Sequence, residues 1–365
     1  MPVSAVDCVQ PALQHTREQL FRPFRFGQWS RLALVGILAA ELHSTSCHFN
    51  GINLPFPQQR RQGFVATPFP HLDPSRMAEL AGVFIAAMVL AFILFFVFLY
   101  IGSVFRFILF DSVIKKHCSI SEGWSRWHRT GRRYFVWQLV FVIFELLVLG
   151  VVIGGPLALA AALGWFHNAG EHVVRSVLGV ILLIGLFLLF LLLAVVVQLL
   201  AKDFLVPIMA LEEVDFADGW SRLMAMIKPE PGKYAVYLLL KFVLAIAAAI
   251  IFGILILVPI IAIVAPVLLG VFAGYKAGMV WNVSTVSLAI IVGSILLAIL
   301  IYLVALVNVP ATVFFPAFSI YFFASRYPKL DALLNPAPPA PVLPPLTESP
   351  PPFETPPLPP SPEPV

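Results

Sequence analysis

Three long stretches of the chain contain no charged residue, and they restrict the fold more than any other feature. They run from Leu80 to Phe105, from Ser176 to Ala201 and from Val286 to Val307. Each is longer than the roughly 20 apolar residues with which a helix crosses a hydrocarbon core of about 30 Å. Because backbone groups in lipid must bond within the segment, each stretch is predicted to be a transmembrane helix.

Two further apolar segments are long enough to cross a membrane, although each contains one charge. Tyr134 to Gly154 includes Glu145, and Tyr234 to Val258 includes Lys241. The run from Leu32 to Ala40 is too short to cross on its own. The whole chain is 60% hydrophobic and 12% charged, well beyond the roughly 45–50% apolar usage of soluble domains. The predicted fold class is therefore an all-α polytopic membrane bundle.

A Trp-Ser-Arg signature occurs three times at nearly constant spacing. The copies begin at Trp29, Trp124 and Trp220, so the two spacings between consecutive copies differ by only one residue. An apolar segment follows each copy. A fixed period indicates structural repeats, so we predict about six spans in three parallel two-helix repeats, the first span following Trp29. The expected division is a cytoplasmic N-terminal segment at 1–19, a transmembrane domain at 20–329 with repeats at about 20–115, 116–211 and 212–329, and a disordered Pro-rich cytoplasmic tail at 336–365.

Polar segments ahead of the second and third signatures predict interfacial helices on the cytoplasmic face. Ser119 to Glu122 has the pattern of a capping box, and Asp215 to Asp218 keeps a cap oxygen and a negative charge near a helix start. We expect Gly131 and Gly232 to turn the chain from these helices into the next span. Tryptophan on an apolar face with basic residues opposite is typical of a helix in the headgroup plane. The predicted interfacial anchors are Trp29, Trp124, Trp127 and Trp220.

The distribution of Lys and Arg predicts the orientation in the membrane. The segments on one side of the predicted spans carry 17 of these residues and those on the other side carry five, while Lys241 lies within a span. Positive loops stay in the cytoplasm, so both termini are expected there. The formal net charge of +4 then reflects topology and the leaflet potential, and it does not indicate nucleic-acid binding.

The two charges inside predicted spans suggest an intramembrane pair. Counted from Tyr134 and Tyr234, where their helices enter the membrane, Glu145 lies roughly 16 Å deep and Lys241 roughly 10 Å deep at about 1.5 Å per residue. Each charge alone costs about 2.5–3.5 kcal/mol at mid-membrane, so a partner or a wet cavity is expected. The alternative is that Lys241 reaches the interface while Glu145 is protonated or hydrogen-bonded.

No pattern in the sequence predicts a catalytic, cofactor or metal site. Asp215 to Arg222 resembles part of the phosphatidyltransferase motif, but it lacks the Ala before its Arg and the two downstream aspartates. A helix cap explains the same residues. His43, Cys47 and His48 are metal-ligand types, but their spacing is loose and a polar interface loop is the simpler interpretation. We therefore expect a protein that is not an enzyme.

Three prolines follow the odd-numbered spans in apolar surroundings. They are Pro156, Pro259 and Pro266. Prolines at such positions suggest re-entrant or interfacial turns on the outer face, which are tolerated only where protein buries them. This region is the one in which the sequence hints at a cavity.

The C-terminal segment is of a different kind. From Pro336 to Val365, half of the sequence is proline. Such a tail stays extended as polyproline II and cannot build a core. Its PxxP patterns leave two interpretations open, an inert tether or a docking segment for a membrane or cytoplasmic protein partner.

The segment Leu20-Phe21-Arg22-Pro23-Phe24-Arg25-Phe26-Gly27-Gln28-Trp29, with the repeated loops, resembles uncharacterised prokaryotic six-span families. These are similar to the membrane domain that accompanies some bacterial glycerophosphodiester phosphodiesterases. The resemblance covers roughly Leu20 to Lys329. It implies a protein of the bacterial cytoplasmic membrane and brings no assigned activity. The catalytic barrel of those enzymes takes roughly 250 residues, and no soluble stretch here approaches that length.

Two functions of different classes fit these observations. The first is a non-enzymatic scaffold, assembly or regulatory protein, multi-pass in the cytoplasmic membrane and surrounded by lipid. The second is a transporter or channel for a small solute or lipid, because repeats about an axis along the membrane normal occur in transport proteins.

Overall fold

The computed structural model describes residues 4–39, 74–162, 173–278 and 282–335, and every regular element in these ranges is helical. The elements ahead of the long helices are η1 (Val6–Cys8), α1 (Val9–Phe21) and α2 (Phe26–Leu38). The long helices and their π-helical turns are α4 (Pro74–Ile114), α5 (Ile120–Leu149), η2 (Gly150–Gly154), α6 (Gly155–Ala162), α7 (Val173–Leu200), η3 (Ala201–Leu205), α10 (Pro231–Lys276) and α11 (Val283–Ala324). The short helices are α8 (Val206–Glu212), α9 (Phe216–Ile227) and α12 (Pro328–Leu334).

Five helical segments in the described ranges are long and apolar enough to cross a membrane. They are Ala81–Ile114, Ile120–Ala162, Val177–Glu212, Pro231–Gly274 and Ser284–Ala324. Each contains or overlaps a span predicted from the sequence, so these five predictions are confirmed in length and composition. The predicted first span is not among them: α2 has 13 residues, and residues 40–73, which follow it, lie outside the described ranges.

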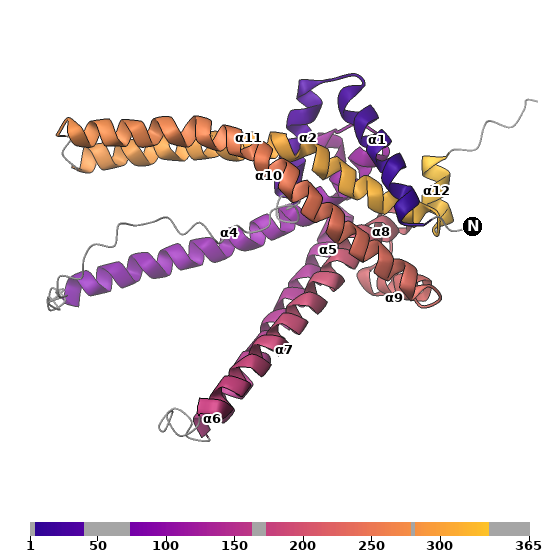
Figure 1. Ribbon diagram of the computed structural model, residues 1–365, viewed down its shortest axis with the longest axis horizontal. Helices are drawn as coiled ribbons and strands as arrows, with labels where there is room; N and C mark the ends of the chain where they lie inside the picture. The colour runs from indigo at the N-terminus through magenta and orange to yellow at the C-terminus, as the bar shows by residue number, and fades with distance from the viewer. Residues whose placement is uncertain (1–3, 40–73, 163–172, 279–281, 336–365) are drawn as a thin grey trace, which may run out of the picture.

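The helices form a packed hub from which three arms extend (Figure 1). The hub consists of α1, α2, α8, α9 and α12 together with the adjoining ends of the long helices. The first arm is α4, the second is α5 to α7, and the third is α10 with α11. The arms point away from the same side of the hub and diverge toward their tips (Figure 1).

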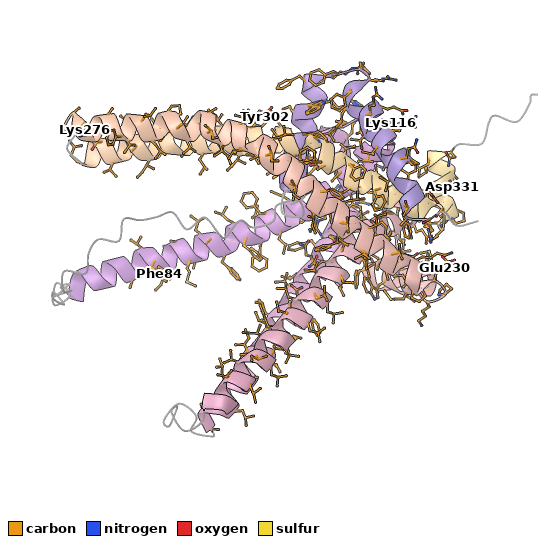
Figure 2. The ribbon with its side chains drawn as sticks, viewed as in Figure 1. Phe84, Lys116, Glu230, Lys276, Tyr302 and Asp331 are labelled. Carbon is orange, nitrogen blue, oxygen red and sulfur yellow. The ribbon has the colours of Figure 1, made fainter. Side chains whose placement is uncertain are left out.

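The buried core of the protein lies in the hub. The largest fully buried side chains are mainly aromatic: Tyr134, Tyr237, Phe107, Phe204, Phe318, Phe322 and Phe323. The apolar side chains of the arms are instead mostly exposed on the protein, as Figure 2 shows along α4 around Phe84. Burial of apolar surface drives packing in water, whereas lipid tails are as apolar as the side chains and provide no such force between helices. This contrast explains why the hub is packed and the arms diverge.

A separate short helix ahead of the next long helix is found only after Asp215, and the expected turn at Gly232 is wrong because Gly232 lies inside α10. Helix α5 starts after Ser119 and continues through Gly131 to Leu149, so the expected turn at Gly131 is wrong. Helix α9 starts after Asp215 and ends at Ile227, and α10 begins at Pro231. Pro229 and Pro231 lie at the boundary between α9 and α10, whereas α5 contains no proline, and proline disrupts helical hydrogen bonding. Neither Ser119 nor Asp215 makes the side-chain cap that its pattern predicted.

The expected turns at the outer prolines are also not observed. Pro259 and Pro266 lie inside α10, which is continuous for 46 residues. Pro156 lies in α6, directly after the π-helical turn η2. A transmembrane helix tolerates proline where local adjustments satisfy the freed backbone groups. The hint of a cavity at these positions is therefore not supported by the structure.

Gly131 allows α4 and α5 to pack closely, and this gives a prediction. A Cβ added at Gly131 would lie 2.7 Å from Val104 Cγ2 and 2.9 Å from Val104 Cα. Gly131→Ala is expected to lower the free energy of unfolding by about 1–3 kcal/mol through overpacking. Gly232→Ala serves as the control, since nothing lies within 4 Å of its added Cβ. Thermal unfolding of both variants in detergent is the measurement, and equal melting temperatures would contradict the prediction.

Candidate functional site

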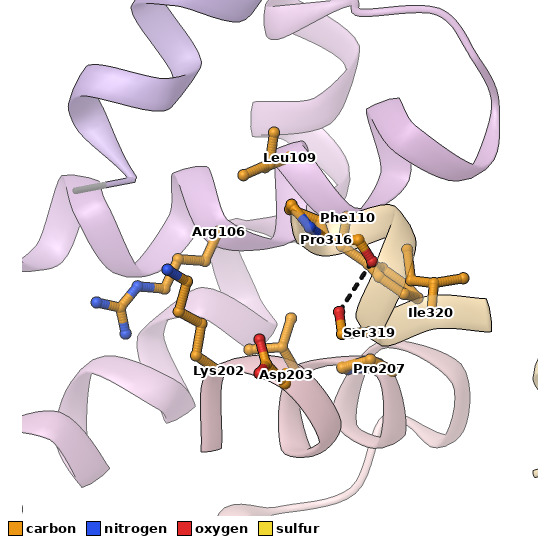
Figure 3. Close-up of a pocket in the computed structure, with 10 residues that line it drawn as sticks. Arg106, Leu109, Phe110, Lys202, Asp203, Pro207, Pro316, Ser319 and Ile320 are labelled. Carbon is orange, nitrogen blue, oxygen red and sulfur yellow. Dashed lines mark hydrogen bonds between the residues drawn. The ribbon is translucent and has the colours of Figure 1, made fainter. Parts of the chain in front are cut away.

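A small cavity lies where the three arms meet the hub. Its lining comes from α4, from η3 with α8, and from α11, so each arm contributes one wall. The polar residues that line it are Arg106, Lys202, Asp203 and Ser319 (Figure 3). The cavity volume is about 30 Å³, which is room for one or two waters at about 10–15 Å³ each.

Asp203 is the centre of a buried polar network beside this cavity. The Lys241 ammonium lies 2.6 Å from Asp203 Oδ1 and 2.5 Å from Oδ2, and the Tyr237 hydroxyl donates to Oδ2 at 2.9 Å. Asp203 is 4% exposed and Lys241 is 7% exposed. Buried charges are stable in proteins when they are paired and hydrogen-bonded. The network therefore joins the second arm to the third through one carboxylate.

The structure gives Lys241 a different partner from the one suggested by the sequence. Glu145 lies on α5 within the second arm, and it has no ion-pair partner among the described residues. Lys241 instead contacts Asp203, which lies two residues after the uncharged run from Ser176 to Ala201. Side chains tilt toward the N-terminus of their helix, and α10 starts in the hub (Figure 1). Lys241 therefore reaches back into the hub, where Asp203 lies.

Arg106 connects the cavity to α5. Its Nη1 donates to the Tyr134 hydroxyl at 2.7 Å, and its guanidinium lies over the Tyr134 ring at 5.5 Å from the centroid. The Arg106 Nε atom is buried and has no hydrogen-bond partner. On the same pair of helices, the Ser103 hydroxyl donates to Gln138 Oε1 at 3.0 Å. Polar contacts thus join the first and second arms where these arms meet the hub.

The four predicted interfacial tryptophans lie in the hub but differ in burial. Trp127 is 5% exposed and stacks on Phe107, whereas Trp124 is 36% exposed. Trp29 is half-buried and donates from Nε1 to the Leu20 carbonyl at 3.0 Å. Trp220 is half-buried and stacks on Phe216 within α9. Trp127 is therefore a core residue, and the other three lie at the surface of the hub.

The residues of the phosphatidyltransferase-like pattern take part in ion pairs between elements. Asp215 lies 3.1 Å from Arg133 Nε of α5, and Arg222 pairs with Glu212 of α8. Within the described ranges there is no group of three or more His, Cys, Asp or Glu side chains that could hold a metal ion. The alternative metal ligands His43, Cys47 and His48 lie outside those ranges.

His15 connects α1 to two of the long helices. It is buried, and its Nε2 donates to the Val113 carbonyl at 2.9 Å. In this tautomer Nδ1 accepts from the Tyr321 hydroxyl at 3.2 Å. Burial lowers the pKa of His15 below its ordinary value, although the hydrogen bond to the Val113 carbonyl opposes this shift. The nearby Lys116 also lowers the pKa, and Glu18 raises it. The neutral ring is therefore the form that the fold favours.

The lowered pKa of the buried His15 predicts that the hub loses stability in mild acid. Because the folded pKa of His15 lies below the unfolded value of about 6.5, the unfolded chain binds more protons between the two values. The contribution of the neutral His15 ring to the free energy of unfolding is complete above about pH 6.5 and is lost as the pH falls. Melting temperatures measured between pH 8 and pH 5 should show the fall, and His15→Gln should reduce it. An unchanged pH profile in the variant would contradict this assignment.

The sequence matches a family of unknown function, DUF7544, over residues 3–333. The chain belongs to this family. The DUF7544 match includes the hub, all three arms and α12 up to residue 333. Searches among curated proteins and among solved structures find no match. Family membership shows no link between this DUF7544 protein and the membrane domain that accompanies some glycerophosphodiester phosphodiesterases.

Proposed function

We propose that the protein is a non-enzymatic scaffold, assembly or regulatory protein of the bacterial cytoplasmic membrane. In this proposal the transmembrane domain has six spans in three parallel two-helix repeats, the first built on the apolar run Leu32 to Ala40. Apart from the part of α2 that begins the first span, the hub lies on the cytoplasmic side, where the predicted topology places most of the Lys and Arg residues. Both termini are then cytoplasmic, and the Pro-rich tail at 336–365 extends into the cytoplasm.

The observation that carries the proposal is the divergence of the arms (Figure 1). A transporter or channel needs spans that surround a path through the membrane. In the described ranges, the apolar side chains of α4 from 81 to 95 are all exposed, so this helix forms no wall of a protein-lined path. A packed cytoplasmic body on separate membrane anchors is the geometry of a protein that holds other components in place.

One observation favours transport as the second candidate. Asp203, Lys241 and Tyr237 form a buried charged network beside a cavity at the convergence of the arms. Ionisable residues within spans often mark the pathways of substrates and ions. In this alternative the arms would close around a solute, and charge removal at Asp203 would abolish its movement.

Flux through reconstituted vesicles separates the two functions. The full chain is placed in phospholipid vesicles loaded with dyes that respond to pH, sodium or potassium, and the movement of each ion is measured against vesicles without protein. The scaffold proposal predicts rates equal to those of empty vesicles. A higher rate that disappears in the double variant Asp203→Asn/Lys241→Met would overturn it in favour of transport. The double variant is used because it leaves no unpaired buried charge.

A further inference from the structure

The turn between α1 and α2 exposes a surface that is both aromatic and basic. Phe21, Phe24 and Phe26 are 52%, 60% and 60% exposed, and Arg22 and Arg25 between them are also exposed. An exposed apolar patch of this kind marks an interaction site. Aromatic rings that alternate with cations are typical of surfaces at the boundary between water and lipid. These five residues are called the aromatic turn below.

A hydrogen bond and two ring contacts place the aromatic turn beside the third arm. The Tyr302 hydroxyl of α11 donates to Ser30 Oγ at 2.9 Å. The ring of the neighbouring Trp29 lies 5.7 Å from that of Phe21 and 5.6 Å from that of Phe24, measured between centroids. Figure 2 labels Tyr302 where the third arm joins the hub, and Figure 1 shows the turn between α1 and α2 standing out to the side of this junction.

The level of Tyr302 along α11 coincides with the edge of the hydrocarbon core. The helix starts directly after Asn282, which forms a capping box with Thr285, and such a polar start favours the headgroup region at the arm tip. Counted from Asn282 at about 1.5 Å per residue, Tyr302 lies about 30 Å along the helix, which matches a hydrocarbon core of about 30 Å. Most described side chains from Ser284 to Ile301 are exposed, whereas none from Tyr302 to Ala324 is exposed. The aromatic turn therefore lies where the third arm leaves the core on the side of the hub.

A surface cavity beside the aromatic turn fits an anionic group. Its volume is about 410 Å³, and its lining includes Arg22, Arg25, Lys116, His117 and Glu18. Lys116 pairs with Glu18 at 2.7 Å, whereas Arg22 and Arg25 have no ion-pair partner among the described residues. Arginine binds phosphate through two parallel N–H groups. The cavity therefore keeps a positive charge at the level where lipid phosphates lie.

We propose that the aromatic turn is a lipid-binding element of the hub. The rings of Phe21, Phe24 and Phe26 enter the edge of the adjoining leaflet, and Arg22 and Arg25 bind the phosphates of anionic phospholipids. Lipid surrounds the third arm, so it is the partner that meets the turn at this level. In the proposed orientation this is the cytoplasmic leaflet, which carries anionic lipid. The inference does not depend on whether the protein is a scaffold or a transporter.

Fluorescence quenching in lipid nanodiscs tests the insertion. Cys8, Cys47 and Cys118 of the full chain are replaced by alanine, and Phe24→Cys carries an environment-sensitive dye. Quenching by lipids with a doxyl group near the top of the acyl chain is compared with quenching by aqueous iodide. Leu333→Cys is the matched control, because Leu333 is 50% exposed on α12, on the far side of the hub from the arms (Figure 1). The ratio of lipid quenching to iodide quenching should be several-fold higher for the Phe24→Cys label.

Lipids with different headgroups test the role of the arginines. The dye is placed at Phe26→Cys, which also provides a second position if loss of the Phe24 ring disturbs the turn. Doxyl-labelled phosphatidylglycerol and phosphatidylcholine share a phosphate but differ in net charge. We expect phosphatidylglycerol to be enriched about fivefold or more around the dye, because each basic side chain near a lipid surface contributes about that preference. Arg22→Gln/Arg25→Gln should remove the enrichment, and Arg129→Gln/Lys228→Gln, which removes two exposed hub cations elsewhere, should keep it.

Three results would overturn the proposal. Iodide quenching of the Phe24→Cys label as strong as that of the Leu333→Cys label would place the turn in water. Equal quenching by the two lipids while both arginines are present would show that the turn does not select anionic phospholipid. A label that neither quencher reaches until residues 336–365 are deleted would show that the Pro-rich tail, and not lipid, covers the turn.

Discussion

Asp203→Asn is expected to lower the free energy of unfolding by about 3–5 kcal/mol, because it leaves the Lys241 ammonium buried without a counter-charge. The Tyr237 hydroxyl also loses the charged acceptor to which it donates at 2.9 Å. Lys241→Met should have an effect of similar size, since it leaves the carboxylate unpaired. Chemical denaturation in detergent micelles, followed by circular dichroism, measures both changes.

The double variant shows whether the pair itself is the cause. Asp203→Asn/Lys241→Met removes both charges, so it should recover most of the stability that either single variant loses. Asp218→Asn is the control for the chemical change, because Asp218 is an exposed residue in the first turn of α9, and its effect should stay within about 0.5 kcal/mol. A double variant as unstable as the sum of the singles would show that the two charges do not interact.

Trp127→Ala is expected to destabilise the hub by about 3–5 kcal/mol, as large-to-small changes at buried aromatic residues do. Trp127 is 5% exposed, and its ring stacks on the fully buried Phe107 with 5.9 Å between the centroids. Trp124→Ala provides a matched comparison on the same helix, close by in the sequence. Trp124 is 36% exposed, so its removal forms a smaller cavity and should cost distinctly less.

Fluorescence separates these two tryptophans further. Each is kept as the single tryptophan of the hub in turn, and an aqueous quencher is added. Trp124 should be quenched readily and Trp127 weakly. Equal quenching together with equal destabilisation by the two alanine variants would contradict the placement of Trp127 in the core.

The spans could be predicted from the sequence because hydrophobicity within a window of about 20 residues is a local property. The uncharged run from Leu80 to Phe105 needs no tertiary partner to form a helix in lipid. The starts of α5 after Ser119 and of α9 after Asp215 were also predictable from cap-type residues. Six spans and the three-repeat organisation stay predictions.

The packing of the hub depends on residues that are distant in the sequence, and local patterns did not show it. Asp203 and Lys241 are 38 residues apart, and nothing in either neighbourhood identifies the other as its partner. Gly131 suggests a turn because glycine is common in turns, but in the structure its missing Cβ allows the close approach of Val104. The separate helix α9 depends on Pro229 and Pro231, because α5 contains no proline and continues without a break.

The central claim is that the packed hub holds the helices together while the arms diverge. Measuring distances between the first and second arms in a lipid nanodisc tests this claim most directly. Cys8, Cys47 and Cys118 are replaced by alanine, and nitroxide labels are attached in pairs. The pair Phe95→Cys/Leu193→Cys lies nearer the hub, and the pair Phe84→Cys/Leu182→Cys lies nearer the tips; all four residues are exposed. On each helix the two labelled positions are about three helical turns apart, so they lie on nearly the same face. Between these two levels, the distance between two helices packed at about 20° would increase by about 6 Å. The account predicts a clearly larger increase toward the tips, and an increase no larger than that of packed helices would contradict it.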